Sequence, residues 1–223
     1  MSSGKKLKIV TFSYDDGVEQ DRRLMEILNR YRLKATINLN SGIQSGAGQN
    51  KNAFIRRMNI AGLPALYEGH EIAVHSLTHP RLEMLEDETI FNELEQDKLN
   101  LERIFGKPVQ GMAYPFGTYN DRVIRIAGRI GLRYARGVGD TLSFDIPLNL
   151  MAYIPTCHHK NPQLMELAER FVKLKPETPQ VFYVWGHSYE FDMDRNWQVL
   201  EDFCKFISGR DGIAYCTNAE ALL

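Results

Sequence analysis

Short apolar segments recur along the whole chain, and segments with helical periodicity separate them. The apolar or alternating segments have the length of β-strands and cover residues 7–14, 34–40, 71–75, 111–114, 132–138, 150–154, 181–185 and 213–216. Apolar residues at helical spacing lie between them, at residues 19–32, 63–67, 86–105, 121–129, 162–173 and 197–207. This alternation predicts an α/β fold whose strands run parallel and are joined by crossover helices.

Polar residues follow several of these predicted strands directly. Asp15 and Asp16 stand at the end of the first strand, His75 ends the third, and His187 follows the seventh. In a closed β/α barrel the carboxyl ends of all strands lie on one face, and active sites are built there. Strands so far apart in order would converge less easily in an open sheet. We therefore predict that residues 1–223 form a single domain, a distorted (β/α)7-type barrel.

The composition argues against several classes of protein. Hydrophobic residues make up 43% of the chain and charged residues 25%, with a net charge of −1, which is ordinary for a globular protein. No block of Lys and Arg indicates a nucleic-acid surface, and no apolar segment is long enough to span a membrane. The first residues lack the apolar core of a secretion signal. We expect a cytoplasmic protein, or a secreted one if a leader segment has been removed, and the oligomeric state stays open.

Three cysteines, Cys157, Cys204 and Cys216, make an odd number and contain no Cys-x-x-Cys pair. This argues against a disulfide framework and against a cysteine zinc site. We interpret Cys204 and Cys216 as small core residues of a helix and a strand. Cys157 precedes His158 and His159 at the end of the sixth predicted strand, where position alone could bring either histidine to a substrate.

Two adjacent carboxylates end the first predicted strand. Read alone, Asp-Asp-Gly is more often a turn in which Asp makes local hydrogen bonds. Side chains alternate along an extended chain, however, so Asp15 and Asp16 should point in different directions. That arrangement suits two tasks, in which one carboxylate holds a cation and the other handles a proton.

His75 and His79 are four residues apart, a spacing at which two imidazoles can share one cation. Alone, such a pair is more often two surface histidines. Together with Asp16 they form an open coordination set for a catalytic divalent ion, which would lower the pKa of bound water and polarise a carbonyl. Asp15 could take the proton from that water, and His187 could return one to the leaving group. Taken by itself, His187 would be a buried histidine bonded to the backbone.

These residues resemble the polysaccharide deacetylase family, the NodB-homology domains of carbohydrate esterase family four. Ser13-Tyr14-Asp15-Asp16-Gly17 is similar to the family's Thr-Phe-Asp-Asp-Gly motif, and His75-Ser76-Leu77-Thr78-His79 fits its His-(Ser/Thr)-x-x-His motif. Tyr114-Pro115-Phe116-Gly117 resembles part of the third motif, and Trp185-Gly186-His187 resembles the late Leu-x-His motif. The motifs occur in the family's order, so the resemblance covers most of the chain.

The resemblance implies an activity and a cofactor. The family fold is a distorted β/α barrel, and its members hydrolyse N-acetyl or O-acetyl groups on sugars or oligosaccharides with a metal-activated water. By position, Asp16, His75 and His79 would be the ligands of one divalent ion. The family usually uses zinc, with cobalt, nickel or manganese as alternatives.

The resemblance also implies roles for four further residues. Asp15 would be the general base and His187 the general acid. The backbone N–H of Phe116 would help to hold the oxyanion, which is usually a large electrostatic contribution. Ser76 would orient the histidine loop.

The chain departs from the family pattern in two motifs. The third motif carries an Arg two residues before its Pro, which pairs with the base, and here Ala113 takes that place. Arg136, at the end of the fifth predicted strand, could substitute for it. The fourth motif supplies an Asp that acts on the catalytic histidine. The candidates for that Asp are Asp140, Asp145, Asp192 and Asp194.

Two other functions stay open. The chain could hydrolyse C–N bonds of a cyclic amide or ureide, which a cytoplasmic location would favour. It could also be a catalytically inactive carbohydrate-binding relative, for which Ala113 is the only support. The intact motif residues argue against the inactive reading.

Overall fold

The computed structural model describes residues 6–43 and 54–223. In these ranges the strands form one parallel sheet in the order β5-β4-β3-β2-β1-β7-β6, and β8 pairs with β1 beside β2. The strands are β1 (Lys8–Asp15), β2 (Ala35–Leu39), β3 (Glu71–Val74), β4 (Gly111–Ala113), β5 (Tyr134–Arg136), β6 (Cys157–His158), β7 (Gln180–Gly186) and β8 (Ile213–Tyr215).

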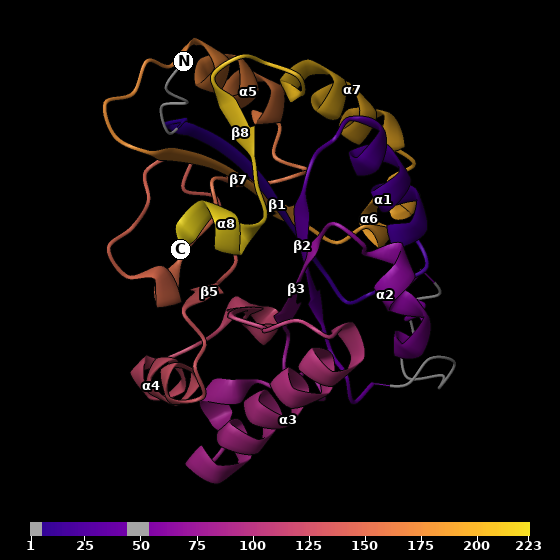
Figure 1. Ribbon diagram of the computed structural model, residues 1–223, viewed down its shortest axis with the longest axis vertical. Helices are drawn as coiled ribbons and strands as arrows, with labels where there is room; N and C mark the ends of the chain where they lie inside the picture. Colours follow the sequence, from indigo (N-terminus) through magenta and orange to yellow (C-terminus); the bar gives the residue numbers. More distant parts are fainter. Residues whose placement is uncertain (1–5, 44–53) are drawn as a thin grey trace.

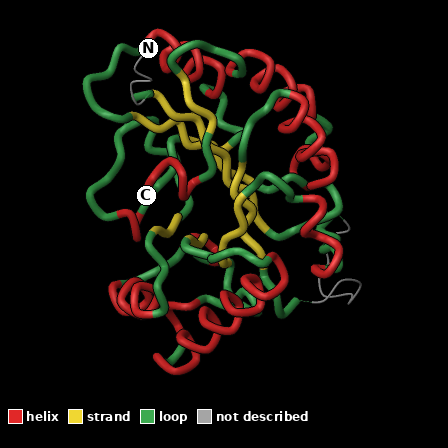
Figure 2. Tube along the Cα trace, viewed as in Figure 1, coloured by secondary structure: helices red, strands yellow, loops and turns green. Residues whose placement is uncertain are grey.

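Most helices lie around the outside of the sheet, whose strands run through the middle of the molecule (Figures 1 and 2), while α8 packs against its interior face. They are α1 (Asp21–Arg30), α2 (Leu63–Leu66), α3 (Asp87–Phe105), α4 (Asp121–Arg129), α5 (Leu164–Lys173), α6 (Tyr189–Met193), α7 (Trp197–Ile207) and α8 (Asn218–Leu222). The predicted α/β class is confirmed. The short helices α6 and α8, of five residues each, were not predicted.

The sheet curls on itself, and the segment after β5 spans the gap between its edges. The N–H of Gly137 donates to the carbonyl of Tyr153 at 2.9 Å, and the N–H of Tyr153 donates to the carbonyl of Ala135 at 3.0 Å. A few residues later β6 pairs with β7. The row of seven parallel strands thus encloses an interior, in agreement with the predicted distorted (β/α)7-type barrel.

The predicted strand at residues 150–154 is wrong. Leu150–Ala152 form a 3-10 turn, and the strand is Cys157–His158. The side chain of Asn149 accepts a hydrogen bond from the N–H of Met151 at 3.0 Å and so caps the turn. A short apolar run cannot by itself distinguish a strand from a helical turn.

Alternate side chains of β1 face the interior of the barrel and the helical layer. Thr11 donates to the Oδ1 atom of Asn218 at 2.8 Å, and the Oγ atom of Ser13 accepts from Arg136 at 3.1 Å. Phe12, between them, packs its ring against an aromatic ring of α7. The interior near β1 therefore holds polar groups, next to a small apolar cluster that includes Ile9, Val181 and Tyr183. The larger apolar core lies between the sheet and the helices.

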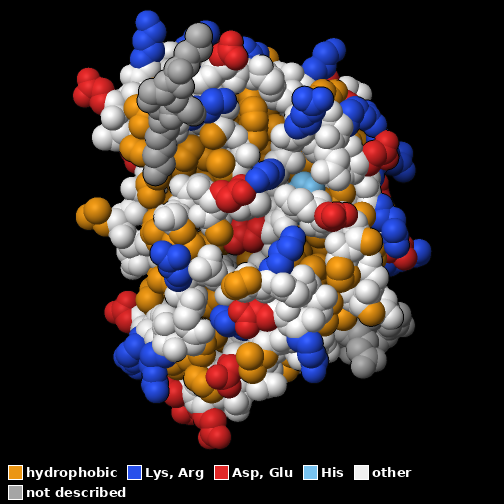
Figure 3. All heavy atoms as spheres, viewed as in Figure 1, with side chains coloured by type: hydrophobic (Ala, Val, Ile, Leu, Met, Phe, Trp, Pro, Cys, Tyr) orange, Lys and Arg blue, Asp and Glu red, His pale blue; other side chains and the backbone are white. Residues whose placement is uncertain are grey.

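The surface charges and the cysteines agree with what the sequence predicts. On the face shown in Figure 3, Lys and Arg side chains are interspersed with Asp and Glu and do not gather in one patch. No helix in the described parts of the chain is both long and apolar enough to cross a membrane. Cys157, Cys204 and Cys216 are all free thiols, so the prediction that they build no disulfide framework is confirmed.

His70 joins the start of β2 to helix α1. Its Nδ1 atom accepts a hydrogen bond from the N–H of Ala35 at 3.1 Å, and its Nε2 atom lies 3.0 Å from the Oδ1 atom of Asn29. Because Nδ1 accepts, the neutral ring carries its hydrogen on Nε2 and donates to Asn29. Burial lowers the pKa of His70 to about 4.

We expect acidification to destabilise the fold through His70. The pKa is about 4 in the folded chain and ordinarily 6.5, so the unfolded chain binds the proton first as the pH falls. The stability that the neutral ring contributes is thus lost from about pH 6.5 toward pH 4, and by pH 5 the loss reaches about 2 kcal/mol. Chemical denaturation near neutral pH and at about pH 5 measures it. The His70→Gln variant, which keeps a donor and an acceptor, should lose about 2 kcal/mol less than the wild type. Equal losses would contradict this assignment.

Candidate active site

The residues predicted for catalysis and metal binding lie together at the carboxyl ends of the strands. They line one pocket of about 480 Å³. The six residues are Asp15, Asp16, His75, His79, Phe116 and His187. Parallel pairing explains the convergence, because each residue ends or follows a strand and all strand ends point to the same face.

Asp16, His75 and His79 offer one ligand atom each, and these atoms lie within 4.8 Å of one another. The Nδ1 atom of His75 donates to the carbonyl of Ala113 at 2.8 Å, which leaves a lone pair on its Nε2 atom. The Nε2 atom of His79 lies 3.1 Å from that atom. Two ligands bound at about 2.0–2.1 Å in a tetrahedral site have a similar separation. The donor set therefore fits a divalent cation such as zinc.

The two histidines are neutral and their loop is held in place. Burial lowers the pKa of His75, and it lowers the pKa of His79 to about 4, so both rings keep a lone pair for a metal at neutral pH. The Oγ atom of Ser76 accepts from the N–H of His79 at 3.1 Å. Asp97 of α3 accepts from the N–H of His75 at 3.1 Å, and Asn40 donates to the carbonyl of Ser76 at 2.8 Å.

Four non-glycine residues of the site adopt left-handed backbone conformations. Their φ angles are 83° at Asp16, 62° at Ser76, 61° at His79 and 58° at Phe116. L-residues rarely adopt such values, which persist where the surrounding structure fixes them and which gather at functional sites. The ring of Phe116 is half-exposed and meets the ring of His79 edge-on, with 4.6 Å between centroids.

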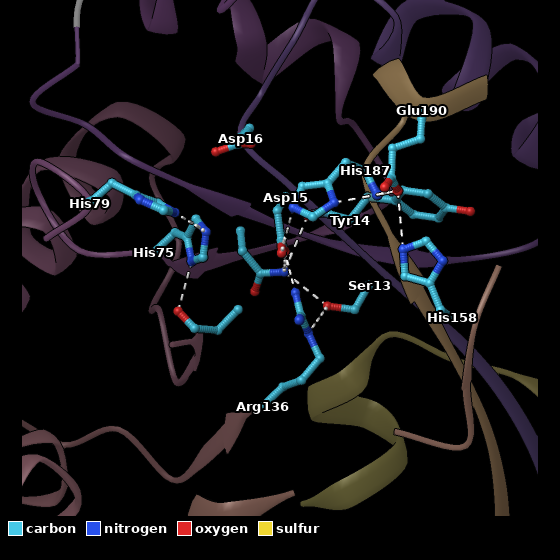
Figure 4. Close-up of polar contacts among 12 residues, drawn as sticks. Ser13, Tyr14, Asp15, Asp16, His75, His79, Arg136, His158, His187 and Glu190 are labelled. Atoms are coloured by element: carbon cyan, nitrogen blue, oxygen red, sulfur yellow. Dashed lines mark hydrogen bonds and ion pairs between the residues drawn. The ribbon is translucent and has the colours of Figure 1, made fainter. Parts of the chain in front are cut away.

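Asp15 is buried and carries a cationic partner. Its Oδ1 atom accepts a hydrogen bond from Arg136 (Figure 4). The same atom accepts a second one from Asn38 at 2.8 Å. Burial alone would raise the pKa of Asp15, but the charge of Arg136, helped by His75 and His187, lowers it to about 2. Asp15 is therefore ionised, and its Oδ2 atom is free of these two donors.

Arg136 reaches Asp15 from β5 across the interior of the barrel. In the sheet its Cα atom pairs with Ala113 of β4, the position at which the family pattern carries an arginine. The Nε atom of Arg136 also donates to the Oγ atom of Ser13 at 3.1 Å. The contacts support the expectation that Arg136 substitutes for the missing residue, from the next strand and at the same level of the sheet.

Arg57 is a site residue that the sequence analysis missed. Arg57 lies between β2 and α2 in the chain. It forms an antiparallel bridge with Val18, which follows β1. Its guanidinium donates to the Oδ1 atom of Asp16. This contact orients the carboxylate of Asp16. Arg57 lies outside the regular helices and strands, so periodicity in the sequence could not identify it.

Glu190 is the second residue that the sequence analysis missed. It stands in the first turn of α6, and its Oε2 atom lies 3.4 Å from the Nδ1 atom of His187 and accepts from the N–H of His187 at 3.0 Å. The Nε2 atom of His187 lies 3.7 Å from the Oδ2 atom of Asp15. Burial would lower the pKa of His187, but Glu190 and the charge of Asp15 raise it above the ordinary value.

The four aspartates considered as partners of His187 make their hydrogen bonds and ion pairs elsewhere. They contact the backbone N–H of His158 (Asp140), Gln180 (Asp145), Trp197 (Asp192) and Lys160 (Asp194). That expectation is therefore corrected in favour of Glu190. The spacing His187-x-x-Glu190, with both residues in the turn after a strand, is the signal that could have identified it.

His158 and His159 do not line the pocket. The ring of His159 is stacked between Tyr14, at a centroid distance of 5.7 Å, and Phe191, at 4.1 Å. Burial keeps the pKa of His159 well below its ordinary value, so this ring is neutral. Direct contact of either histidine with a substrate in the pocket is not supported.

Comparison with known proteins gives a family match and a set of similar folds. A family model described as polysaccharide deacetylase matches residues 2–135, more than half of the chain. A comparison with curated proteins finds no match. A family 4 carbohydrate esterase from Streptomyces lividans, solved with acetate, has a TM-score of 0.60 at 16% identity, over 93% of this chain and 91% of that one.

Two further solved structures share the fold. A polysaccharide deacetylase from Bacillus cereus has a TM-score of 0.57 at 17% identity, over 94% of this chain and 91% of that one. A protein from Bacillus anthracis, described as a pseudoenzyme of the same esterase family, has a TM-score of 0.61 at 17% identity, over 99% and 67%. At these identities the likeness concerns the fold alone, and it confirms the predicted fold class.

The Arg136–Asp15 pair predicts a large loss of stability when the cation is removed. Arg136→Met leaves a buried carboxylate without its partner, which should lower the free energy of unfolding by about 3–5 kcal/mol. The exposed pair of Arg30 and Glu26 offers a control, since Arg30→Met should cost less than about 1 kcal/mol. Adding Ala113→Arg to Arg136→Ala should recover part of the loss, because the new arginine enters the same interior. Urea denaturation at neutral pH measures all variants, and equal losses for Arg136→Met and Arg30→Met would contradict the pair's role.

Proposed function

Because the chain belongs to the polysaccharide deacetylase family, we propose that it is a metal-dependent hydrolase that removes acetyl groups from N-acetylated or O-acetylated sugars. One observation carries the proposal, the placement of an ionised Asp15 between the Asp16-His75-His79 set and His187. The pocket of about 480 Å³ lies within the range of small-molecule sites and has room for a sugar ring with its acyl group.

Asp16, His75 and His79 would hold the divalent ion. When bound, this ion would polarise the acyl carbonyl and lower the pKa of a water molecule. Two imidazoles and one carboxylate suit zinc, and cobalt, nickel or manganese would also fit the set.

Asp15 would act as the general base through its Oδ2 atom. Arg136 and Asn38 both bind the Oδ1 atom, so Oδ2 is the oxygen left to accept a proton. With a pKa of about 2 the carboxylate is ionised throughout the neutral range. Arg136 would also hold the carboxylate still, so that it faces the pocket during proton transfer.

His187 would act as the general acid through its Nε2 atom. Its Nδ1 atom faces Glu190, which leaves Nε2 directed toward Asp15 and the pocket. The raised pKa of His187 keeps its ring protonated closer to neutral pH. Departure of an amine requires a proton on the leaving nitrogen, and Nε2 would supply it.

Phe116 and the aromatic residues around it would bind the acyl group and the sugar. The backbone N–H of Phe116, in a turn with φ of 58°, would stabilise the negative charge that develops on the acyl oxygen. Trp185, Tyr114 and Tyr189 line the same pocket, where aromatic faces could stack on a sugar ring.

Arg136 weakens the case for an inactive relative. The only sequence feature in favour of that reading was the absence of an arginine at Ala113. Arg136 provides the same charge at the same carboxylate, by way of β5. The absence of an arginine at position 113 therefore does not argue against hydrolase activity.

Separate variants should distinguish the base from the metal ligands. Asp15→Asn should retain the divalent ion and lose turnover by about 10²-fold or more, because only the proton acceptor is removed. His79→Ala should lose both the ion and the activity, because one of three ligands is removed. Elemental analysis of the purified variants and acetate release from N-acetylglucosamine oligomers give the two readouts. Full metal content and full rate in His79→Ala would show that the ligand assignment is wrong.

A substrate screen tests the reaction itself. We expect the zinc-loaded wild type to release acetate from short N-acetylated or O-acetylated sugars, and Asp15→Asn to serve as the matched blank. Hydrolysis of cyclic imides or ureides without any acetate release would select the alternative C–N hydrolase. Bound zinc with no turnover of either class would select the inactive relative.

A further inference from the structure

Glu190 contacts three histidines. Its Oε2 atom lies 3.4 Å from the Nδ1 atom of His187 and 3.1 Å from the Nε2 atom of His158 (Figure 4). The Nε2 atom of His159 lies farther away, at 3.5 Å. Neither Glu190 nor His158 lines the catalytic pocket. Glu190 therefore connects His187, which lines the pocket, to His158, which does not.

The backbone of Lys160 fixes the tautomer of His158. Its N–H donates to the Nδ1 atom of His158 at 3.1 Å, so Nδ1 is the acceptor of the ring. A neutral imidazole has one accepting and one donating nitrogen. The Nε2 atom of His158 therefore carries the hydrogen and presents it to Glu190.

A second cation is the competing explanation for this cluster. His158, His159 and Glu190 each offer one ligand atom, and these atoms lie within 4.8 Å of one another. A metal would need the lone pair of Nε2 of His158, but the only lone pair of the neutral ring already accepts from Lys160. The ammonium of Lys160 also lies 3.4 Å from the Oε1 atom of Glu190, so the carboxylate already faces a cation. The contacts favour a chain of side chains in close polar contact over a metal.

Contacts with Asp140 and Trp185 hold His158 in place. Asp140 accepts from the N–H of His158 at 2.6 Å and from the side chain of Asn161 at 2.6 Å, which clamps the loop after β6. The ring of Trp185 meets the ring of His158 edge-on at 4.5 Å. His158 is therefore a fixed donor rather than a mobile surface side chain, and Asp140 acts on the loop rather than on His187.

We propose that His158 is a positioning residue for His187 and acts through Glu190; the inference rests on the proposed function of His187 as the general acid. His158 holds the carboxylate so that its Oε2 atom faces Nδ1–H of His187, which leaves Nε2 of His187 for the substrate. In the protonation step the Nε2 proton of the imidazolium passes to the leaving nitrogen or oxygen. The Nδ1 hydrogen stays on the ring and faces Glu190 before and after the transfer.

The leaving group provides the activity test. An N-acetyl sugar needs a proton on its leaving nitrogen, whereas p-nitrophenyl acetate releases a phenolate that needs none. Glu190→Gln should lower the ratio of amide to aryl-ester turnover by about 10²-fold, and His158→Leu by about tenfold. His158→Gln keeps an N–H near the position of Nε2 and should restore much of the ratio. Asp145→Asn, which removes an aspartate bonded to Gln180 and remote from His187, is the control and should leave the ratio unchanged.

A spectroscopic readout separates this inference from the proposed function. Long-range ¹H–¹⁵N spectra of the wild type should show His187 with its hydrogen on Nδ1 when the ring is neutral, and Glu190→Gln and His158→Leu should lose that preference. Preserved tautomer shifts with no acetate release by the wild type would reject the deacetylase function and leave the positioning chain standing. If the wild type is active and both variants keep its turnover ratio and its His187 tautomer, then His158 and Glu190 do not position His187. Elemental analysis that finds two ions per chain in the wild type and one in His158→Gln would replace it by a second metal site.

Discussion

Asp15 and Arg136 form an ion pair in the interior of the barrel, where their exposed fractions are 3% and 1%. Burial disfavours the ionised form of this carboxylate and would raise its pKa. The guanidinium prevents this and lowers the pKa of Asp15 to about 2. The same contact joins β1 to β5, which have β2, β3 and β4 between them in the sheet. One interaction therefore sets the charge of the pocket and ties together opposite walls of the barrel.

The architecture could be predicted from the sequence because it depends on regular spacing. Apolar periodicity identified strands and helices, and helices α4 and α7 have the predicted bounds. The parallel arrangement then placed the residues after the strands on one face, which brought Asp15, His75 and His187 together. The strand predicted at residues 150–154 failed for a local reason, because the apolar run Leu150–Ala152 is turned by the cap of Asn149. Where packing on both faces removes the alternation, hydrophobicity alone does not decide between strand and turn.

The residues that hold the catalytic groups were harder to predict than the groups themselves. Ala113 and Arg136 are neighbours only because of the register of β4 and β5. The sequence therefore allowed an arginine on β5 to replace one on β4, but did not require it. Glu190 depends on α6, a helix too short to show a period, and on a turn that brings its carboxylate back to His187. Arg57, which binds the carboxylate of Asp16, lies outside the regular helices and strands. In each case the partner residue reaches the catalytic group across the barrel interior or from a turn. Neither arrangement leaves a repeated pattern in the sequence.

Arg136 lies at the edge where the barrel closes. There β5 is three residues long, and the pairing of Gly137 and Ala135 with Tyr153 joins it to the chain that leads to β6, itself only two residues long. Short pairings of this kind open more readily than the long ladder between β1 and β7, and such opening does not require the whole fold to unfold. A brief separation at this seam would draw the guanidinium away from Asp15 while the rest of the barrel stays intact. Opening of this wall would thus break the buried ion pair, and amide exchange at Gly137 and Tyr153 reports on that opening.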